Sequence, residues 1–440
     1  AGAEKSDYSD MESLLGDDDA GFEETSVVEA SNMINKNIAE DIEEESVSLS
    51  GDLYMRSTYT MTRDFFERKK NSFEGNSLLT YLDGSLFLDV RLRKNIKAFC
   101  NLNLFYSPTG QATYTYYTDK LTGTPLVLEE TNRTAIIFKE LFLDANIAHR
   151  VYFRMGKQVL QWGRGYFWNP SDLINIENKD FLNLDRAREG TYGVKTHIPF
   201  GTAFNIYSFL DAKNAGNLDE FALAGKLEAL IISTELSLSA WAKKGYFPSY
   251  ACDLSSRIPL VNVDIYGEAR VSYGDNAYKL RRETNTITNY VQYKTFEEWI
   301  PRISIGLSKS FDLFDINDRI MVSGEFFYNH NGYDENIFDD KAFVASLAAS
   351  GRYKMNRHSK YYASIFTSIS KFILSDMTLS CNAIGNLSDS SFILTGGLSY
   401  SPVYNFALGL SFISYLGKDE REYTYAGNSL GIEINSSITF

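Results

Sequence analysis

The chain has 440 residues, 44% of them hydrophobic and 14% aromatic, and a formal net charge of −14 at pH 7. This acidic balance argues against nucleic-acid binding, which depends on a basic surface. No apolar run approaches the length of about 18 residues that indicates a transmembrane helix. The chain opens AGAEKSDYSD, which is not a signal peptide, and we expect a mature chain from which the signal has been removed.

Residues 1–50 form an acidic N-terminal segment that differs from the rest of the chain. Acidic clusters occur at 17–19, 23–24 and 43–45, whereas the aromatic residues that are common later are nearly absent. Apolar residues recur at roughly helical spacing over 25–44, as in a short amphipathic helix. The composition is equally typical of a solvated, partly disordered tail. A sharper interpretation is a plug or a docking segment for a periplasmic partner.

From residue 51 to residue 440 the sequence alternates between apolar and polar positions in one segment after another. In the last segment the apolar positions are Leu430, Ile432, Ile434, Ile438 and Phe440, and between them lie Gly431, Glu433, Asn435, Ser437 and Thr439. A period of two places the two sets on opposite faces of a strand. Charged and hydroxyl side chains on one face suit a hydrated lumen, and the apolar face suits lipid. Because lipid offers no partners to backbone groups, such a sheet must close on itself.

The joints between these segments alternate in length. Short joints are expected at 93–95, 148–149, 200–201, 259–260 and 401–404. Most of the intervening joints are longer, at 64–77, 108–133, 162–189, 274–296, 331–357 and 417–427. Short turns on one side and long loops on the other are typical of outer-membrane barrels. The sequence therefore predicts an all-β fold, a transmembrane antiparallel β-barrel of about 18 strands over residues 51–440.

Three details complete the predicted fold. The strand near 52–63 should pair with the strand near 428–440 and so close the barrel. The N-terminus and the C-terminus of the barrel segment should then both lie on the periplasmic side. The sequence DDKAFVASLAAS, at 339–350, has helical spacing and helix-forming residues, so we expect a short helix in that outer loop.

The stretch from Arg154 to Asn175 is the most distinctive segment of the chain. It begins as a strand in which Arg154 and Gln158 share the polar face, and its glycines then allow a sharp exit. Asn169-Pro170-Ser171-Asp172 is turn and cap chemistry. Burial of the aromatic residues of the loop is favourable, whereas its arginines are more stable in contact with water. We therefore predict that the loop after the fifth strand, residues 163–189, folds inward and forms the narrowest part of the lumen.

The residues that we expect to form this pore constriction, or to anchor the loop to the wall, are Arg150, Arg154, Gln158, Trp162, Arg164, Trp168, Asn169, Asp172, Arg186 and Arg188. With Asp172, Asp185 and Glu189, the arginines would make a charged constriction of the kind by which wide pores select ions. The alternative is that arginines and carboxylates pair and pin the loop to the wall, and both can hold. For Trp162 and Trp168, one interpretation is an interfacial girdle or loop packing. The other is a surface on which sugars or aromatic solutes stack.

The end of the chain and the stretch from Arg154 to Asn175 both resemble known sequences. Phe440, on an alternating last strand, resembles the signal that outer-membrane porins present to the barrel assembly machinery. The stretch GKQVLQWGRGYFWNPSDLIN resembles the motif of a porin-like outer-membrane family related to alginate-export-type porins. The matching residues are Gly156, Lys157, Gln158, Trp162, Gly163, Phe167, Asn169, Pro170, Asp172 and Leu173. The resemblance implies an integral barrel in the outer membrane of a Gram-negative or other diderm bacterium, in contact with lipid and with lipopolysaccharide as a further candidate partner.

The leading functional interpretation is a porin-like channel that passes small hydrophilic solutes through a loop-constricted lumen. The alternative is an export or assembly barrel that docks periplasmic or cell-surface partners. An enzyme is the weakest interpretation, because no Ser/His/Asp set lies near one loop. The histidines are scattered at His149, His197, His330 and His358, so we expect no metal site and no cofactor. We expect His358 to serve as a structural hydrogen-bond partner.

Overall fold

The computed structural model describes residues 46–62, 76–92, 96–118, 125–174, 190–213, 215–283, 290–314, 316–349 and 353–440; for 110–118 and 125–132 it describes the backbone alone. The acidic N-terminal segment expected over residues 1–50, with its helix over 25–44, therefore lies outside the described residues except for 46–50. The second half of the predicted inward loop, residues 175–189, lies outside them as well.

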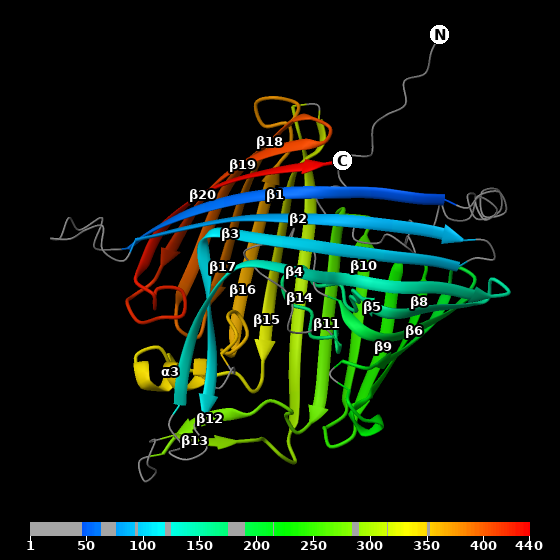
Figure 1. Cartoon of the computed structure of the whole chain (residues 1–440), viewed down its shortest axis with the longest axis horizontal. Helices are drawn as coiled ribbons and strands as arrows, with labels where there is room; N and C mark the ends of the chain where they lie inside the picture. The colour runs from blue at the N-terminus through cyan, green and yellow to red at the C-terminus, as the bar shows by residue number, and fades with distance from the viewer. Residues whose placement is uncertain are drawn as a thin grey trace.

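Eighteen antiparallel strands form one closed sheet (Figure 1), which confirms the predicted barrel. The strands of the barrel are β1 Ser46–Thr62, β2 Ser77–Leu92, β3 Ile96–Thr118, β4 Pro125–Ile147, β5 Val151–Gln158, β6 Thr191–Phe200, β7 Phe204–Asp211, β8 Ala222–Ile231, β9 Thr234–Lys243, β10 Ser249–Ile258, β11 Val263–Tyr273, β14 Trp299–Leu313, β15 Ile316–Asn329, β16 Tyr361–Ile369, β17 Met377–Asn386, β18 Ser391–Val403, β19 Phe406–Leu416 and β20 Asn428–Thr439. A separate hairpin consists of β12 Lys279–Arg282 and β13 Tyr290–Tyr293. The helical elements are the single turn η1 Leu218–Glu220 and α3 Lys341–Ala349.

The barrel closes between its first and last strands, as the sequence predicts. The register of β1 and β20 runs from the pair Asp52 and Thr439 to the pair Thr62 and Asn428. At the end of this seam Gly51 and Phe440 exchange both backbone hydrogen bonds, with N···O distances of 2.8 and 2.9 Å. A Cβ on Gly51 would lie 2.6 Å from Cζ of Phe440, so the absence of a side chain there makes room for the terminal ring.

The two faces of the sheet have the predicted chemistry. In β20, Ile434 is 60% exposed whereas the neighbouring Glu433 is 7% exposed. In β2, Leu88 is 39% exposed and Asp83 is 5% exposed. Large aliphatic side chains thus cover the outside of the barrel, and polar side chains face its interior. Among the described residues, no helix has the length and apolar character needed to cross a bilayer.

The connections also alternate in length, with one correction. Short turns such as 148–150 and 404–405 lie at one end of the barrel, where β1 begins and β20 ends. The long loop expected at 108–133 is instead a continuation of β3 and β4, which pair to Thr118 and Pro125. Tyrosine and threonine dominate that part of β3, and their strand preference outweighs the polar character that suggests a loop.

The helix predicted at 339–350 is confirmed as α3. It belongs to a small structure beyond the barrel wall, at the long-loop end, together with the β12–β13 hairpin (Figure 1). Leu280 of β12 and Phe343 of α3 are buried in one cluster with Phe338. The β11–β14 and β15–β16 loops are therefore packed against each other in the part of the chain that the structure describes.

Candidate functional site

Strand β5 presents a polar face that is tied to its neighbours. Arg154 donates from Nε and Nη2 to the two carboxylate oxygens of Asp144 in β4, at 2.8 and 3.0 Å. Its guanidinium also lies 3.9 Å from the centre of the Phe142 ring. Gln158 is fully buried and donates to the backbone carbonyl of Arg154 at 3.1 Å. Two of the predicted site residues thus fix the end of β5 from which the loop departs.

The loop that follows β5 is held by the carboxylate of Glu268 in β11. The backbone N–H groups of Arg164 and Gly165 both donate to Oε1 of Glu268. Ser171 donates to Oε2 from its backbone N–H at 3.1 Å and from its hydroxyl at 2.8 Å. Glu268 is 2% exposed, so four donors from the loop compensate the burial of its charge.

A second carboxylate, Glu325 in β15, receives the next three residues of the loop. Tyr166 and Phe167 donate their backbone N–H groups to Oε2, each at 3.0 Å, and Trp168 donates to Oε1 at 2.7 Å. The hydroxyls of Ser304 in β14 and Tyr266 in β11 also donate to this carboxylate, at 2.8 and 3.2 Å. Three successive backbone donors therefore converge on one buried anion, as in an anion-binding nest.

Beyond these carboxylates the loop packs on the inner side chains of strands β15 to β19. The indole of Trp168 stacks on Phe327, with a centroid distance of 5.6 Å and an angle of 3°, and its Nε1 donates to the carbonyl of Asn356 at 2.9 Å. The buried cluster around it contains Phe167, Tyr362, Ile384, Ile393, Ile413 and Tyr423. Trp168 is 1% exposed, so it serves in packing and offers no surface for a stacked solute.

The first part of the loop packs on strands β7 to β9. Trp162 is 4% exposed and lies in a buried cluster with Leu160, Phe209 and Ala224. Next to it, Nη2 of Arg164 lies 3.4 Å from a carboxylate oxygen of Glu228, and Glu235 and Asp253 complete its acidic surroundings. The loop residues 160–171 thus contact β7 at one end and β19 at the other.

The structure explains why the sequence motif has a glycine at position 163. Its φ is +112°, and a Cβ there would lie 2.6 Å from the hydroxyl of Ser171 and 2.7 Å from the carboxylate of Glu268. Both the backbone conformation and the close approach of the carboxylate therefore require glycine.

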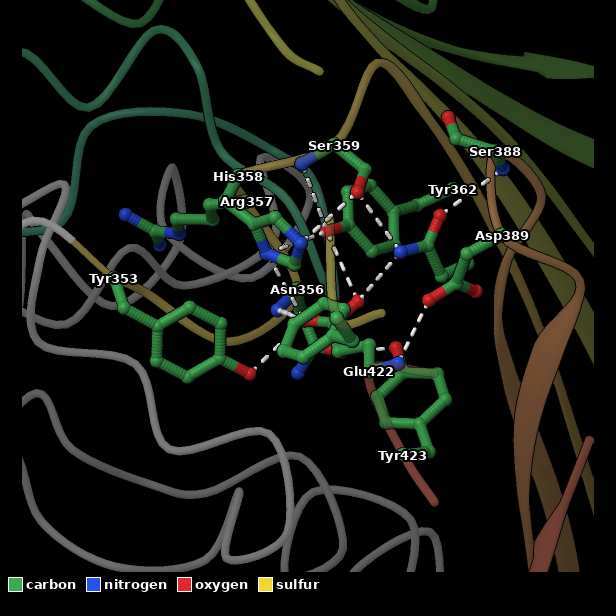
Figure 2. A network of polar contacts seen from close by, with 12 residues as sticks. Tyr353, Asn356, Arg357, His358, Ser359, Tyr362, Ser388, Asp389, Glu422 and Tyr423 are labelled. Carbon is green, nitrogen blue, oxygen red and sulfur yellow. Dashed lines mark hydrogen bonds and ion pairs between the residues drawn. The ribbon is translucent and has the colours of Figure 1, made fainter. Parts of the chain in front are cut away.

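A polar network joins the outer loops next to Trp168 (Figure 2). The carboxylate of Glu422, in the β19–β20 loop, accepts the backbone N–H of Asn356 at 2.8 Å, the hydroxyl of Tyr362 at 3.1 Å and the amide of Asn386 at 2.8 Å. Nδ1 of His358 lies 3.3 Å from the same carboxylate, which agrees with its expected structural role. This carboxylate thereby connects the β15–β16 and β19–β20 loops with the adjoining ends of β16 and β17, next to the carbonyl that receives the Trp168 indole.

Asp389, in the β17–β18 loop, holds the backbone of Glu422 in place. It accepts the backbone N–H of Glu422 at 2.7 Å (Figure 2). It also accepts the hydroxyl of Ser391 at 2.7 Å. Burial raises the pKa of Asp389, and the neighbouring charge of Glu422 raises it further, against these hydrogen bonds.

A group of arginines lies near the long-loop end of β11 and β14. Arg270 and Arg302 occupy directly opposite positions in the two strands. Nη2 of Arg302 donates to Asp275 at 2.8 Å, and Nη2 of Arg270 donates to the hydroxyl of Ser249 at 3.0 Å. Asn331 binds the same carboxylate oxygen of Asp275 at 2.6 Å. Asp275 thus neutralises Arg302, whereas the neighbouring Arg270 is held by a hydroxyl.

Not every predicted site residue belongs to this arrangement. Arg150 lies exposed in the short β4–β5 turn, at the opposite end of β5 from the loop, and not on the strand itself as we expected. Asn169 and Asp172 are buried, and the Asp172 N–H donates to the Asn169 carbonyl at 3.2 Å in a turn. Arg186 and Arg188 lie outside the described residues, together with Asp185 and Glu189.

Sequence reasoning missed the residues that hold the loop most directly. Glu268 and Glu325 were recognisable as polar-face positions of alternating strands, but nothing in their local sequence indicates that a distant loop donates to them. We expected arginine–carboxylate pairs as the main anchors. Arg164 does make such pairs, yet six backbone N–H groups and one hydroxyl carry the greater part of the anchoring.

No protein-family model and no curated protein matches the chain. Its fold is that of outer-membrane porins. Crystal structures of Acinetobacter baumannii OccAB1 and Pseudomonas aeruginosa OccK8 (OprE) each give a TM-score of 0.52, at 9% and 8% identity, over 89% of this chain and 96% and 98% of theirs. A BenF-like porin from Pseudomonas fluorescens Pf-5 gives 0.53 at 9% identity, over 91% of this chain and 99% of its own. At these identities the likeness establishes the fold.

Proposed function

We propose that the protein is an integral outer-membrane channel that passes small hydrophilic solutes by diffusion, without catalysis. The observation that carries this proposal is the attachment of loop residues 164–171 to Glu268 and Glu325, two carboxylates of the polar inner face. A loop fixed to that face narrows the hydrated lumen without blocking it. The porin fold supports the same conclusion by analogy.

The outer surface supports insertion into a bilayer. Around its aliphatic band lie two sets of exposed aromatic side chains, which favour the lipid–water interface. At the long-loop end these are Tyr192, Tyr250, Tyr273 and Trp299, between 45% and 56% exposed. At the short-turn end they are Phe200, Phe314 and Tyr404, between 55% and 105% exposed. The short-turn end would face the periplasm, as in other barrels of this kind. The start of β1 and the end of β20 would both lie on that side.

The constriction itself is part of the proposal. Loop residues 160–171 contact the wall from β7 to β19, and a segment that reaches across so many strands divides the interior of the barrel. Arg164 and its carboxylates would then supply fixed charge at the narrowest level. Residues 175–189, with Arg186 and Arg188, would add to it.

The relationship to alginate-export-type porins rests on the motif from Gly156 to Leu173 and stays a proposal. The structural role of Gly163 gives that motif a physical reason, since loop and wall depend on it. The signal role of Phe440, recognition by the barrel assembly machinery, and a periplasmic partner for residues 1–50 likewise stay proposals.

The experiment that tests the channel is a single-channel recording of the purified protein in planar bilayers. We expect discrete conductance steps, and a larger conductance with weaker ion selectivity when residues 166–180 are deleted. Heat-modifiable migration on gels checks that the variant still forms a barrel. A wild-type protein that inserts but carries no current would refute the channel. A deletion variant that conducts like the wild type would show that this loop is not the constriction.

A further inference from the structure

Four consecutive strands of the barrel carry no charge. Strands β16 to β19 contain no Asp, Glu, Lys, Arg or His, whereas every other barrel strand contains at least one of these residues. The four strands are neighbours in the sheet. Elsewhere the inner face bears ion pairs, for example between Lys226 and Glu228 at 2.8 Å. The interior of the barrel therefore has a charged side and an uncharged side.

The register of these strands lines up their inner side chains in rows. Their outward neighbours are exposed, for example Ile365 at 49% and Phe412 at 49%, which fixes the orientation of the alternate positions. One row across the inner face consists of Ser368, Ser380, Gly397 and Ser411. The row next to it, toward the long loops, contains Asn382 and Thr395. Phe366 and Ile413 flank these two residues in the same row, so the surface is uncharged and combines hydroxyl and amide groups with apolar ones.

Two polar atoms of this surface are buried and lack a partner among the described residues, namely Oγ of Ser364 and Oδ1 of Asn382. Ser364 is 8% exposed. A buried polar atom without a partner is costly, so both require a hydrogen bond from water or from a solute in the lumen. A solute that brings its own hydroxyls, or water, can supply such a bond once these side chains turn toward the lumen.

Aromatic rings flank the hydroxyl surface on the side of the loop. Phe366 and Tyr415 are half-buried and pack against the cluster around Trp168. The ring of Tyr166 lies 5.7 Å from that of Phe366. An aromatic face next to hydroxyl and amide groups matches a sugar ring, which has a C–H face and a rim of hydroxyls.

We propose that the inner wall of β16 to β19 is a binding track for neutral polyhydroxylated solutes, that is, saccharides and polyols. This inference rests on the proposed channel function and names its substrate class. A neutral hydroxyl exchanges its bonds to water for bonds to this wall at little cost. An ion finds no opposite charge there, and on the facing wall most charges already have partners.

The test compares uptake of radiolabelled glucose, glucuronate and glucosamine into proteoliposomes that contain the full chain. The three solutes are similar in size and differ in charge. We expect glucose to enter fastest. We expect Ser411→Asp to lower glucose uptake about fivefold, the effect of losing one hydrogen bond of ordinary strength. Ser255→Asp, an equal change on the inner face of β10, should leave glucose uptake unchanged.

A second variant keeps the test decisive if Ser411→Asp fails to fold. Thr395→Val removes one hydroxyl without adding charge and should lower glucose uptake in the same direction. Glucose uptake no faster than that of the charged sugars, or equal losses in the two aspartate variants, would overturn the binding track while leaving a working channel. A wild-type protein with neither solute uptake nor ion current would overturn the channel function itself.

Discussion

Glu325 of β15 accepts the backbone N–H of Trp168 at 2.7 Å, although 157 residues separate the two in the chain. The same carboxylate accepts the N–H groups of Tyr166 and Phe167. A buried carboxylate with three backbone donors is bound more tightly than a neutral acceptor would be, because each bond is charge-assisted. The position of the loop thus depends on one strand residue far from it in sequence.

Replacing this carboxylate should loosen the loop. Glu325→Gln keeps the size of the side chain but replaces one accepting oxygen with a donor, and each hydrogen bond to a charged group is worth about 1.5–3 kcal/mol. We expect a larger, noisier single-channel conductance and a lower unfolding temperature. Glu433→Gln is the control, because Glu433 pairs with Arg56 and Thr58 of β1 and makes none of the loop's bonds described above. Unchanged conductance in Glu325→Gln would argue against this anchor.

Gly163→Ala should disturb the same loop from the other side. The added methyl would collide with the Glu268 carboxylate in a backbone conformation that itself costs about 1–3 kcal/mol for a non-glycine residue. Gly245→Ala provides the matched control, since Gly245 also has a positive φ, of +76°, but nothing lies within 4 Å of its Cβ position. We expect a change in conductance for Gly163→Ala alone. A conductance of Gly163→Ala no different from that of Gly245→Ala would show that the collision with Glu268 does not displace the loop.

The two faces of β20 should respond differently to charge. Ile434→Arg places a charge on the outer face and should cost about 2–4 kcal/mol near the bilayer midplane. Asn435→Arg places it on the inner face, beside Glu433, and should be far milder. Reversible unfolding in lipid vesicles measures both. Equal destabilisation would show that the faces are assigned the wrong way round.

Acid should weaken the start of α3. The backbone N–H of Phe343 donates to Oδ1 of Asp340 at 2.9 Å and holds the pKa of Asp340 below its usual value, with further lowering by Tyr290 and Arg282. Because the folded pKa is the lower one, the stabilisation is present above the unfolded pKa of 3.8 and is lost as the pH falls through the folded pKa. Amide hydrogen exchange in α3 should therefore accelerate at acid pH.

Two variants separate the charge of Asp340 from its capping role. Asp340→Asn should keep the cap and remove the acid dependence, because Asn caps helices as well as Asp does. Asp340→Ala should cost about 1 kcal/mol at neutral pH. An acid dependence that persists in Asp340→Asn would assign it to another group.

The barrel was predictable because its information is local. Alternation in β2, β11, β15 and β20 assigns each residue to a face, and the requirement for closure then pairs the first strand with the last. The extension of β3 and β4 was missed because polar residues there obscure a strand preference that is also local. Arg150 was misplaced because one residue decides whether a position ends a turn or starts a strand.

The anchors of the loop were not predictable in the same way. Glu268, Glu325 and Glu422 are ordinary polar positions in sequence, and their donors come from segments up to 159 residues away. Backbone N–H groups make most of these bonds, and backbone groups have no signature in the sequence. Only the glycine at 163 records the contact, since it marks where a carboxylate comes too close for a side chain.

The network around Glu422 has a consequence for motion. Its carboxylate is inaccessible to solvent and accepts hydrogen bonds from Asn356, Tyr362 and Asn386, and its backbone N–H donates to Asp389 of the β17–β18 loop. None of these segments can move away without leaving a buried polar group or charge without its partner. The loops that follow β15, β17 and β19 are therefore one cooperative unit. Their amide hydrogens should exchange with solvent at a common rate, as parts of a single opening event, and not at three separate rates.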